Sequence, residues 1–188
     1  MKKKTIALIV CLTLIIGCAI GGTIAWLTAQ TDPVVNTFTV GNVDITLAET
    51  TTDYKMVPGN TIAKDPKVTV KANSEACWLF VKVEKSANYS TYLEDYVMAT
   101  GWQELTADSG VYYRAVDADS ADQEFTVLAS KEGYDNGYVV VKDSVTKSDL
   151  ETAKTTAPTL TFTAYACQKA NVATAADAWT KLNPASAP

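Results

Sequence analysis

The sequence predicts an all-β fold, an antiparallel β-sandwich with a few short peripheral helices. Several short segments rich in Val, Thr, Tyr and Phe alternate apolar and polar residues at the two-residue period of a strand. Turn-forming residues separate these segments, and only three short stretches have helical spacing. This pattern favours strands joined by turns and loops over alternating βαβ units.

The first expected strand covers residues 37–47, in which apolar residues alternate except at Gly41 and Asn42. That interruption shifts the apolar phase by one residue and predicts a bulge or a bend between sheets. Pro58 and Gly59 predict a turn after it. The composition of residues 76–83 is that of a central strand. The other expected strands are residues 67–71, 110–116, 123–128, 138–142 and 159–168, with an exposed loop at residues 133–137.

Helical signals occur in three places. Leu93 and Val97 have helical spacing within residues 90–98, behind a serine cap at Ser90. Ser148 and Glu151 form the pattern of a capping box and predict one short helix. Residues 174–182 carry an apolar stripe of a terminal helix. We therefore expect one β-sandwich domain over residues 41–183, followed by a disordered tail at residues 184–188.

The first 25 residues have the order of charge and hydropathy of an export signal. Three lysines precede an uncharged apolar stretch, and small residues follow up to Ala25. We predict a signal peptide over residues 1–25, cut between Ala25 and Trp26, because Thr23 and Ala25 satisfy the small-x-small rule. The mature protein is then secreted, to the extracellular matrix or the cell surface. The membrane is a partner only through the leader, before cleavage.

Two other fates of this segment stay open. Cys18 ends a lipobox-like sequence and would be the lipidated residue, although the chain remains apolar after it. Residues 5–27 also form an uncharged, mostly apolar run that reaches the roughly 20 residues of a membrane span. In the first case the protein would be a lipoprotein, and in the second it would keep an uncleaved membrane anchor.

The composition argues against several classes of function. Beyond residue 25 the chain has 13 Lys and Arg against 21 Asp and Glu, a formal net charge of −8. We therefore expect no nucleic acid partner, since nucleic acids require basic patches. The whole chain lacks histidine, which removes Ser-His-Asp triads, Cys-His pairs and HExxH zinc sites. We expect no enzymatic activity, no cofactor and no metal centre.

Cysteines and clustered carboxylates each leave two interpretations. Cys77 and Cys167 are the cysteines beyond the leader, and each lies in an expected strand. One disulfide is the favoured interpretation for an exported chain, and two buried free thiols are the alternative. The carboxylates in residues 117–124 could bind calcium, but their spacing is not that of an EF-hand, and a solvated turn is favoured.

Aromatic residues are plentiful, with 4 Trp and 9 Tyr. We expect Trp78, Trp102 and Trp179 to fill the sandwich core and its ends. If Trp102 were exposed, or if Tyr112 and Tyr113 lay on one face, a carbohydrate-binding surface would be indicated instead.

Several motifs occur together at the two ends of the chain. They are the Gly-Gly-Thr-x-Ala leader end at residues 21–25, Asn-Thr-Phe-Thr-Val-Gly-Asn-Val-Asp-Ile at residues 36–45, Val-Pro-Gly at residues 57–59 and Ala-Tyr-Ala-Cys-Gln at residues 164–168. Together they resemble exported proteins of the TasA/camelysin type from Gram-positive bacteria, whose leaders are cut by the signal peptidase SipW. The resemblance is weakest in residues 86–156. It implies a jelly-roll-like β-sandwich, a role in biofilm matrix fibres and SipW as a partner during export. The peptidase chemistry of camelysin is not implied, because no histidine is present.

The resemblance also implies a mechanism of assembly, in which the freed N-terminus adds a strand to the next subunit. The donor segment would be residues 26–40, and Pro33 within it limits how continuous its pairing can be. The alternative is that residues 35–47 form an edge strand of their own domain. The leading hypothesis is a secreted structural protein that self-assembles into a homopolymer. The alternative is a monomeric cell-surface module that binds carbohydrate or protein. The apolar residues of the donor segment are Trp26, Leu27, Val34, Val35 and Phe38.

Overall fold

The computed structural model describes residue 3, residues 41–51 and residues 53–182. Apart from residue 3, the predicted signal peptide lies outside the described residues. So do its cleavage position at Ala25 and Trp26, the donor segment and the tail at residues 184–188. The chain divides into two units, residues 1–39 and residues 40–188, and the second is described here by itself. Among the residues described, no helix combines the length and the apolar content that crossing a bilayer demands.

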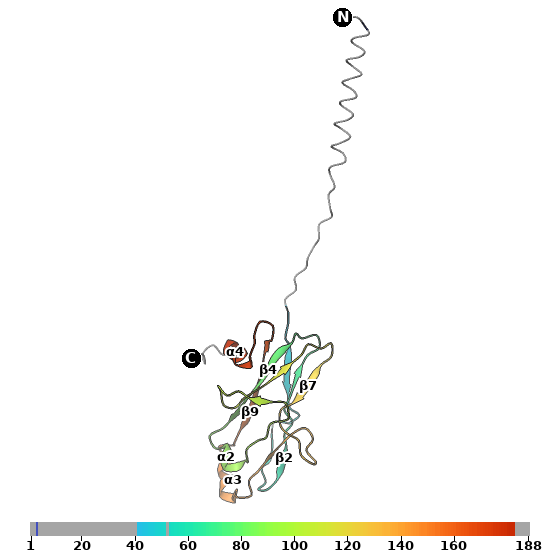
Figure 1. The fold of residues 1–188 in the computed structure, drawn as a ribbon. Coiled ribbons are helices and arrows are strands. Elements are labelled where there is room, and N and C mark those ends of the chain that lie inside the picture. The colour runs from blue at the N-terminus through green and yellow to red at the C-terminus, as the bar shows by residue number, and fades with distance from the viewer. Residues whose placement is uncertain (1–2, 4–40, 52, 183–188) are drawn as a thin grey trace. The chain divides into compact units, whose positions relative to one another are not determined.

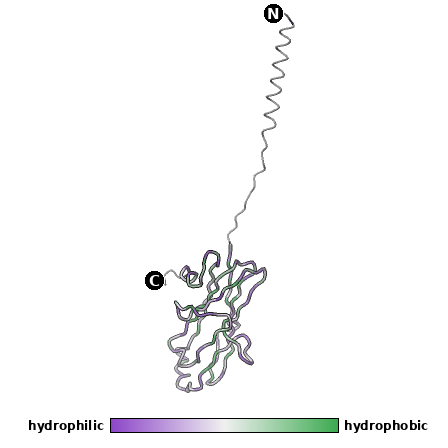
Figure 2. Tube along the Cα trace, in the orientation of Figure 1, coloured by the Kyte–Doolittle hydropathy of each residue, from purple (hydrophilic) through white to green (hydrophobic). Residues whose placement is uncertain are grey.

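The described part of the chain consists mainly of antiparallel strands, which confirms the predicted all-β class (Figure 1). Figure 2 shows hydrophilic and hydrophobic residues interspersed along these strands. The elements are β1 (Ile45–Ala48), β2 (Thr61–Ala63), β3 (Lys67–Val70), β4 (Cys77–Lys85), α2 (Tyr89–Tyr92), β5 (Gln103–Glu104), β6 (Val111–Val116), β7 (Gln123–Thr126), β8 (Tyr138–Val140), α3 (Lys147–Ala153), β9 (Leu160–Gln168) and α4 (Ala175–Leu182).

Two antiparallel sheets pack face to face around the main core. One has the strand order β1-β3-β7 and the other β5-β6-β4-β9, while β2 and β8 form a separate pair. Val68 of β3 and Leu79 and Val81 of β4 are fully buried between the two sheets. β4 is paired on both sides, as expected for residues 76–83. The packing is that of a sandwich, because each sheet buries one face against the other.

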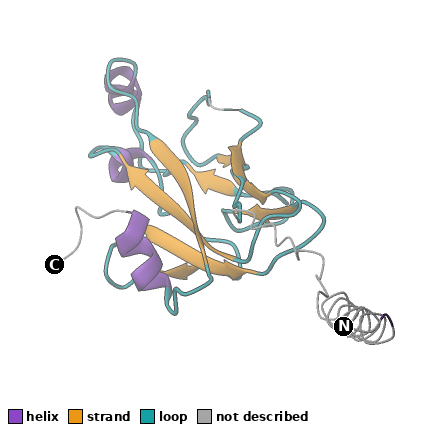
Figure 3. Cartoon of the chain, turned by 90° about the horizontal axis from the view of Figure 1, so that it is seen from above, coloured by secondary structure: helices purple, strands orange, loops and turns teal. Residues whose placement is uncertain are grey.

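Two smaller cores complete the domain. Tyr89, Val139 and Val141 belong to a cluster beneath α2 and α3, which lie at the same end of the domain as β2 (Figure 1). Phe80 and Trp179 pack on the opposite face of β4, which α4 covers. The ring centroids of these two residues lie 5.2 Å apart. The helices therefore lie at the periphery of the strands, as expected (Figure 3).

A helix occurs at each of the three predicted places, but one of the three is shorter than predicted. The expected helix at residues 90–98 is the single turn α2, because Leu93 is extended and bridges to Val141. The capping box of α3 uses Thr146 and Asp149, two residues before the expected pair: Asp149 N donates to Thr146 Oγ1, and Thr146 N donates to the Asp149 carboxylate. The expected terminal helix is α4.

The favoured disulfide between Cys77 and Cys167 is wrong, because both thiols are free. In the β4–β9 ladder Cys77 lies opposite Gln168, and Cys167 lies opposite Trp78. Directly opposed residues share a face of the sheet, and successive residues alternate between faces. Cys77 therefore points into the main core, whereas Cys167 packs on the other face against the cluster that contains Trp179.

Candidate functional site

The end strands on the two sides of the sandwich differ in how their outer edges are covered. On the β7 side, the segment before β5 covers the sheet edge through Ala99 N to Val127 O at 2.9 Å and Ala129 N to Val97 O at 2.8 Å. The indole of Trp102 donates to Thr126 O at 2.9 Å on the same edge. On this side, backbone pairing therefore covers the residues that follow β7, and the indole of Trp102 covers its last residue.

On the other side, β1 and β9 are the end strands of their sheets. Within the residues that the structure describes, β1 pairs only with β3, and β9 pairs only with β4. β9 spans nine residues, whereas the end strands β5, β1 and β7 span two, four and four. A long unpaired edge is a template for another strand, and monomeric proteins usually cover it.

The hydrogen-bond register shows which groups of β9 face outward. Ser86 N donates to Thr159 O at 3.0 Å, and Lys169 N donates to Ala76 O at 2.8 Å. Hydrogen-bonded pairs alternate in an antiparallel ladder, so Thr163 and every second residue from it bond to β4. The intervening residues direct their backbone N–H and C=O groups away from β4. These five residues, which we call the acceptor edge, are Leu160, Phe162, Ala164, Ala166 and Gln168.

Side chains of the acceptor edge face the main core. Leu160, Phe162, Ala164 and Ala166 are partly buried against it. In the other sheet, Leu47 of the end strand β1 is 36% exposed. The acceptor edge thus offers both unpaired backbone and an incompletely covered apolar face, the two features that a docking strand requires.

Two cavities lie at the Leu160 end of the acceptor edge, and both are bordered by Lys64, Leu160 and Thr161. One has a volume of about 390 Å³ and extends toward α2 and β8. The other has a volume of about 350 Å³ and extends toward the end of β1. Additional apolar lining comes from Met56, Ile62, Leu93 and Val139 in the first, and from Leu47, Pro66 and Phe162 in the second.

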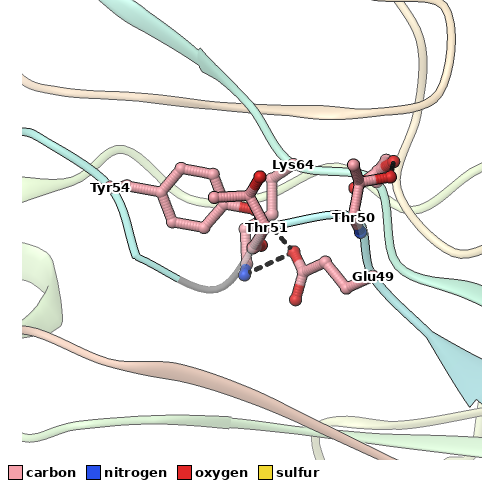
Figure 4. Close-up of polar contacts among 6 residues, drawn as sticks. Glu49, Thr50, Thr51, Tyr54 and Lys64 are labelled. Carbon is pink, nitrogen blue, oxygen red and sulfur yellow. Dashed lines mark hydrogen bonds and ion pairs between the residues drawn. The ribbon is translucent and has the colours of Figure 1, made fainter.

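An ion pair between Lys64 and Glu49 lies beside these cavities: Lys64 borders both, and Glu49 borders the second. Figure 4 shows the pair with Tyr54. Lys64 Nζ lies 2.7 Å from Glu49 Oε1, and the two side chains are 9% and 15% exposed. The ammonium also lies 5.0 Å from the ring centroid of Tyr54 and 5.3 Å from that of Phe162. The Tyr54 hydroxyl donates to Glu49 Oε1 at 3.0 Å. Burial, followed by the hydrogen bond and charge of Glu49, raises the pKa of Tyr54 above its usual range. Lys64 and Tyr54 therefore share Glu49 as a partner beside these cavities.

The aromatic residues that would have indicated a carbohydrate surface do not form one. Trp102 is only 8% exposed, and its indole N–H is bonded. Tyr112 packs in the main core, whereas Tyr113 packs on the opposite face beside Trp78. Their adjacent positions on β6 account for this, because neighbouring strand residues alternate between faces.

The acidic cluster of residues 117–124 is engaged in ion pairs. Asp122 Oδ2 lies 2.7 Å from Lys71 Nζ, and Glu124 Oε2 lies 3.0 Å from Lys67 Nζ. The hydrogen bond from Lys71 lowers the pKa of Asp122. Within the described residues no group of three or more His, Cys, Asp or Glu side chains is placed to hold a metal ion.

Sequence reasoning located β9 but not its free edge, because pairing partners cannot be read from a strand pattern. No protein-family model, curated protein or solved structure matches the chain. The interpretation of the acceptor edge therefore depends on its own geometry.

Proposed function

We propose that the protein is a secreted structural protein that assembles into extracellular fibres by strand donation. In this proposal, cleavage after Ala25 by a SipW-type signal peptidase frees the donor segment, residues 26–40. That segment then pairs with the acceptor edge of the next copy. The observation that carries the proposal is the unpaired outer edge of β9 above an incompletely covered apolar face.

The position of Gly41 shows where the donor segment would join the domain. A Cβ on Gly41 would lie 3.5 Å from Nε2 of Gln168, so the chain enters the domain at one end of the acceptor edge. Glu75 N donates to Asn42 O at 2.9 Å, which holds this entry in place. Residue 41 is therefore held beside the Gln168 end of the acceptor edge.

The sequence of the donor segment fits one strand phase. If the donor segment adds antiparallel to β9, a residue that bonds to the acceptor edge also directs its side chain to the same face as its partner, which is the apolar face. Val34, Phe38 and Val40 share one phase and would supply that apolar contact. Pro33 belongs to the other phase, so its missing N–H is not needed for pairing with β9. A proline at this position is therefore compatible with strand addition.

Truncation tests the proposal. The mature chain from Trp26 is expected to form fibres in negative-stain images, and a chain from Gly41 is expected to stay monomeric by sedimentation. A synthetic peptide of residues 26–40 should bind the truncated chain. Fibres from the truncated chain, or monomers from both chains over a range of concentration and pH, would overturn the proposal.

A matched pair of substitutions tests the phase. Phe38→Asp places a charge on the face that meets the core and is expected to abolish assembly. Thr37→Asp places the same charge on the outward face and is expected to leave assembly intact. The intact mass of the secreted protein checks the leader: the proposal requires a chain that begins at Trp26, without lipid.

A further inference from the structure

Among the residues that the structure describes, Lys64 is the one charged residue that is buried, with 7% of its surface exposed. It directly follows β2, and its backbone N–H donates to Gly137 O at 3.1 Å. Its Nζ lies 2.7 Å from Oε1 of Glu49, whose side chain is 15% exposed. Removing two charges from water is costly, and the attraction between them often fails to offset that cost. Stability alone is therefore a weak reason for this pair to lie inside the domain.

The chain neighbours of Lys64 and Glu49 hold the two residues in contact. Thr50 N donates to Asp65 Oδ1 at 3.1 Å, and Thr50 Oγ1 donates to Asp65 Oδ2 at 2.5 Å. Because Thr50 follows Glu49 and Asp65 follows Lys64, these two bonds fix the backbones of the pair side by side. Groups that are already held together react much faster than free ones, since the entropy of bringing them together has been lost during folding.

Aromatic rings and one hydroxyl surround the contact (Figure 4). The rings of Tyr54 and Phe162 lie beside Lys64 Nζ and limit the access of water to it. The Tyr54 hydroxyl donates to Glu49 Oε1 at 3.0 Å and also reaches Thr51 O. Burial, followed by the hydrogen bond to Glu49, raises the pKa of Tyr54, so this hydroxyl keeps its proton at neutral pH. A donor in this position stabilises negative charge that develops on the carboxyl oxygen.

We infer that Lys64 and Glu49 condense to an amide cross-link between their side chains. A proton first passes from the Lys64 ammonium to Glu49 Oε2, because a poorly hydrated site favours the neutral forms of an amine and an acid. The amine then attacks Cδ of Glu49 and forms the C–N bond. The Cδ–Oε2 bond breaks, and the hydroxyl leaves as water with a second proton from the nitrogen. Oε1 keeps the hydrogen bond from Tyr54 and becomes the amide oxygen.

The reaction needs no other reagent, because one ammonium and one carboxylate become one amide and one water. The water has an exit, since Lys64 and Glu49 both border the cavity of about 350 Å³. The amide closes the loop from residue 49 to residue 64 within one copy of the chain. It therefore does not depend on strand donation, and it would form in a protein that never assembles.

An exposed ion pair of the same length provides a matched control within the chain. Lys154 Nζ also lies 2.7 Å from a carboxylate oxygen, Oε1 of Glu151, but these side chains are 67% and 58% exposed. Water solvates both groups there and favours their charged forms, so we expect no amide between them. The comparison separates the effect of burial from that of contact distance.

Peptide mapping of the full chain tests the cross-link. Trypsin does not cleave after a lysine whose amine is part of an amide, so residues 56–67 should remain one peptide. That peptide should be joined to the one that ends at Lys55, which carries Glu49, with the loss of one molecule of water. Separate peptides with cleavage after Lys64 would overturn the inference. A joined pair at Lys154 and Glu151 would contradict the role of burial.

Three variants test the chemistry. Lys64→Arg keeps the positive charge but is expected to form no cross-link and to unfold at a lower temperature, because its unfolded chain is less restricted. Glu49→Gln should give a product of the same mass as the wild type, since ammonia leaves in place of water. Tyr54→Phe should slow the appearance of the joined peptide about tenfold or more. A joined peptide in Lys64→Arg, or none in a folded Glu49→Gln, would contradict the assignment, and an unchanged rate in Tyr54→Phe would contradict the role of Tyr54. Circular dichroism of each variant checks that the fold is kept.

Discussion

Replacing Ala164 by proline tests whether β9 accepts a strand at its outer edge. The N–H of Ala164 points away from β4, so the folded monomer does not use it. Its removal should change the free energy of unfolding by less than about 1 kcal/mol, as for prolines tolerated on edge strands. In a fibre, the same N–H would bond to the donor segment. Thr163→Pro is the matched control, because the N–H of Thr163 bonds to Lys82 within the β4–β9 ladder.

The size of each effect follows from the register. A lost hydrogen bond costs about 1 kcal/mol, and a buried carbonyl left without a partner costs about 1–3 kcal/mol more. Ala164→Pro should therefore weaken the contact between subunits by about 2–4 kcal/mol, a factor of about 30 or more in the critical concentration for assembly. Thr163→Pro should lower the free energy of unfolding of the monomer by a similar amount. This corresponds to a decrease in Tm of about 5–15 °C.

Two measurements distinguish these outcomes. Urea unfolding followed by circular dichroism gives the stability of each variant, and sedimentation of fibres gives the critical concentration. The reasoning is refuted if Ala164→Pro assembles at the wild-type concentration. It is also refuted if Ala164→Pro destabilises the monomer as much as Thr163→Pro does, because the register would then be wrong.

Three further predictions concern the fold. Gly137→Ala should destabilise by about 3 kcal/mol and Gly133→Ala by about 1 kcal/mol in urea unfolding, because a Cβ on Gly137 would lie 2.4 Å from a backbone oxygen and one on Gly133 would meet nothing within 4 Å. Burial raises the pKa of the Cys77 thiol to about 11, so Cys77 should resist a thiol reagent at pH 8 until the protein unfolds, and fast labelling of the native protein would contradict this. The pKa of Asp122 is lowered by Lys71, so its contribution to stability is present above about pH 4, the unfolded value, and is lost as pH falls through the folded pKa. Asp122→Asn should flatten that acid dependence, and an unchanged profile would count against the ion pair.

The sequence predicts strands well where an apolar pattern is long. Residues 76–83 are apolar in both phases except at Lys82, and most of them belong to the central strand β4. β2 has three residues and β5 has two, too few to establish a period, and neither was predicted. Within residues 90–98 helical spacing is satisfied, but pairing of the extended Leu93 with Val141 decides the structure. Local patterns cannot include such distant partners.

The functional features depend on register, which a single strand does not encode. Cys77 and Cys167 were both assigned to strands, yet an offset of one residue places them on opposite faces. The acceptor edge also depends on register, because only the β4–β9 pairing shows which N–H groups of β9 point away from β4.

Hydrogen exchange in the assembled protein is the most direct test of the acceptor edge. In the monomer, the amides of Thr161 and Thr163 should be protected by β4, while those of Phe162, Ala164 and Ala166 should exchange quickly. In fibres of the mature chain, the second group should become protected as well. Fast exchange of Phe162, Ala164 and Ala166 in fibres would contradict strand donation to β9.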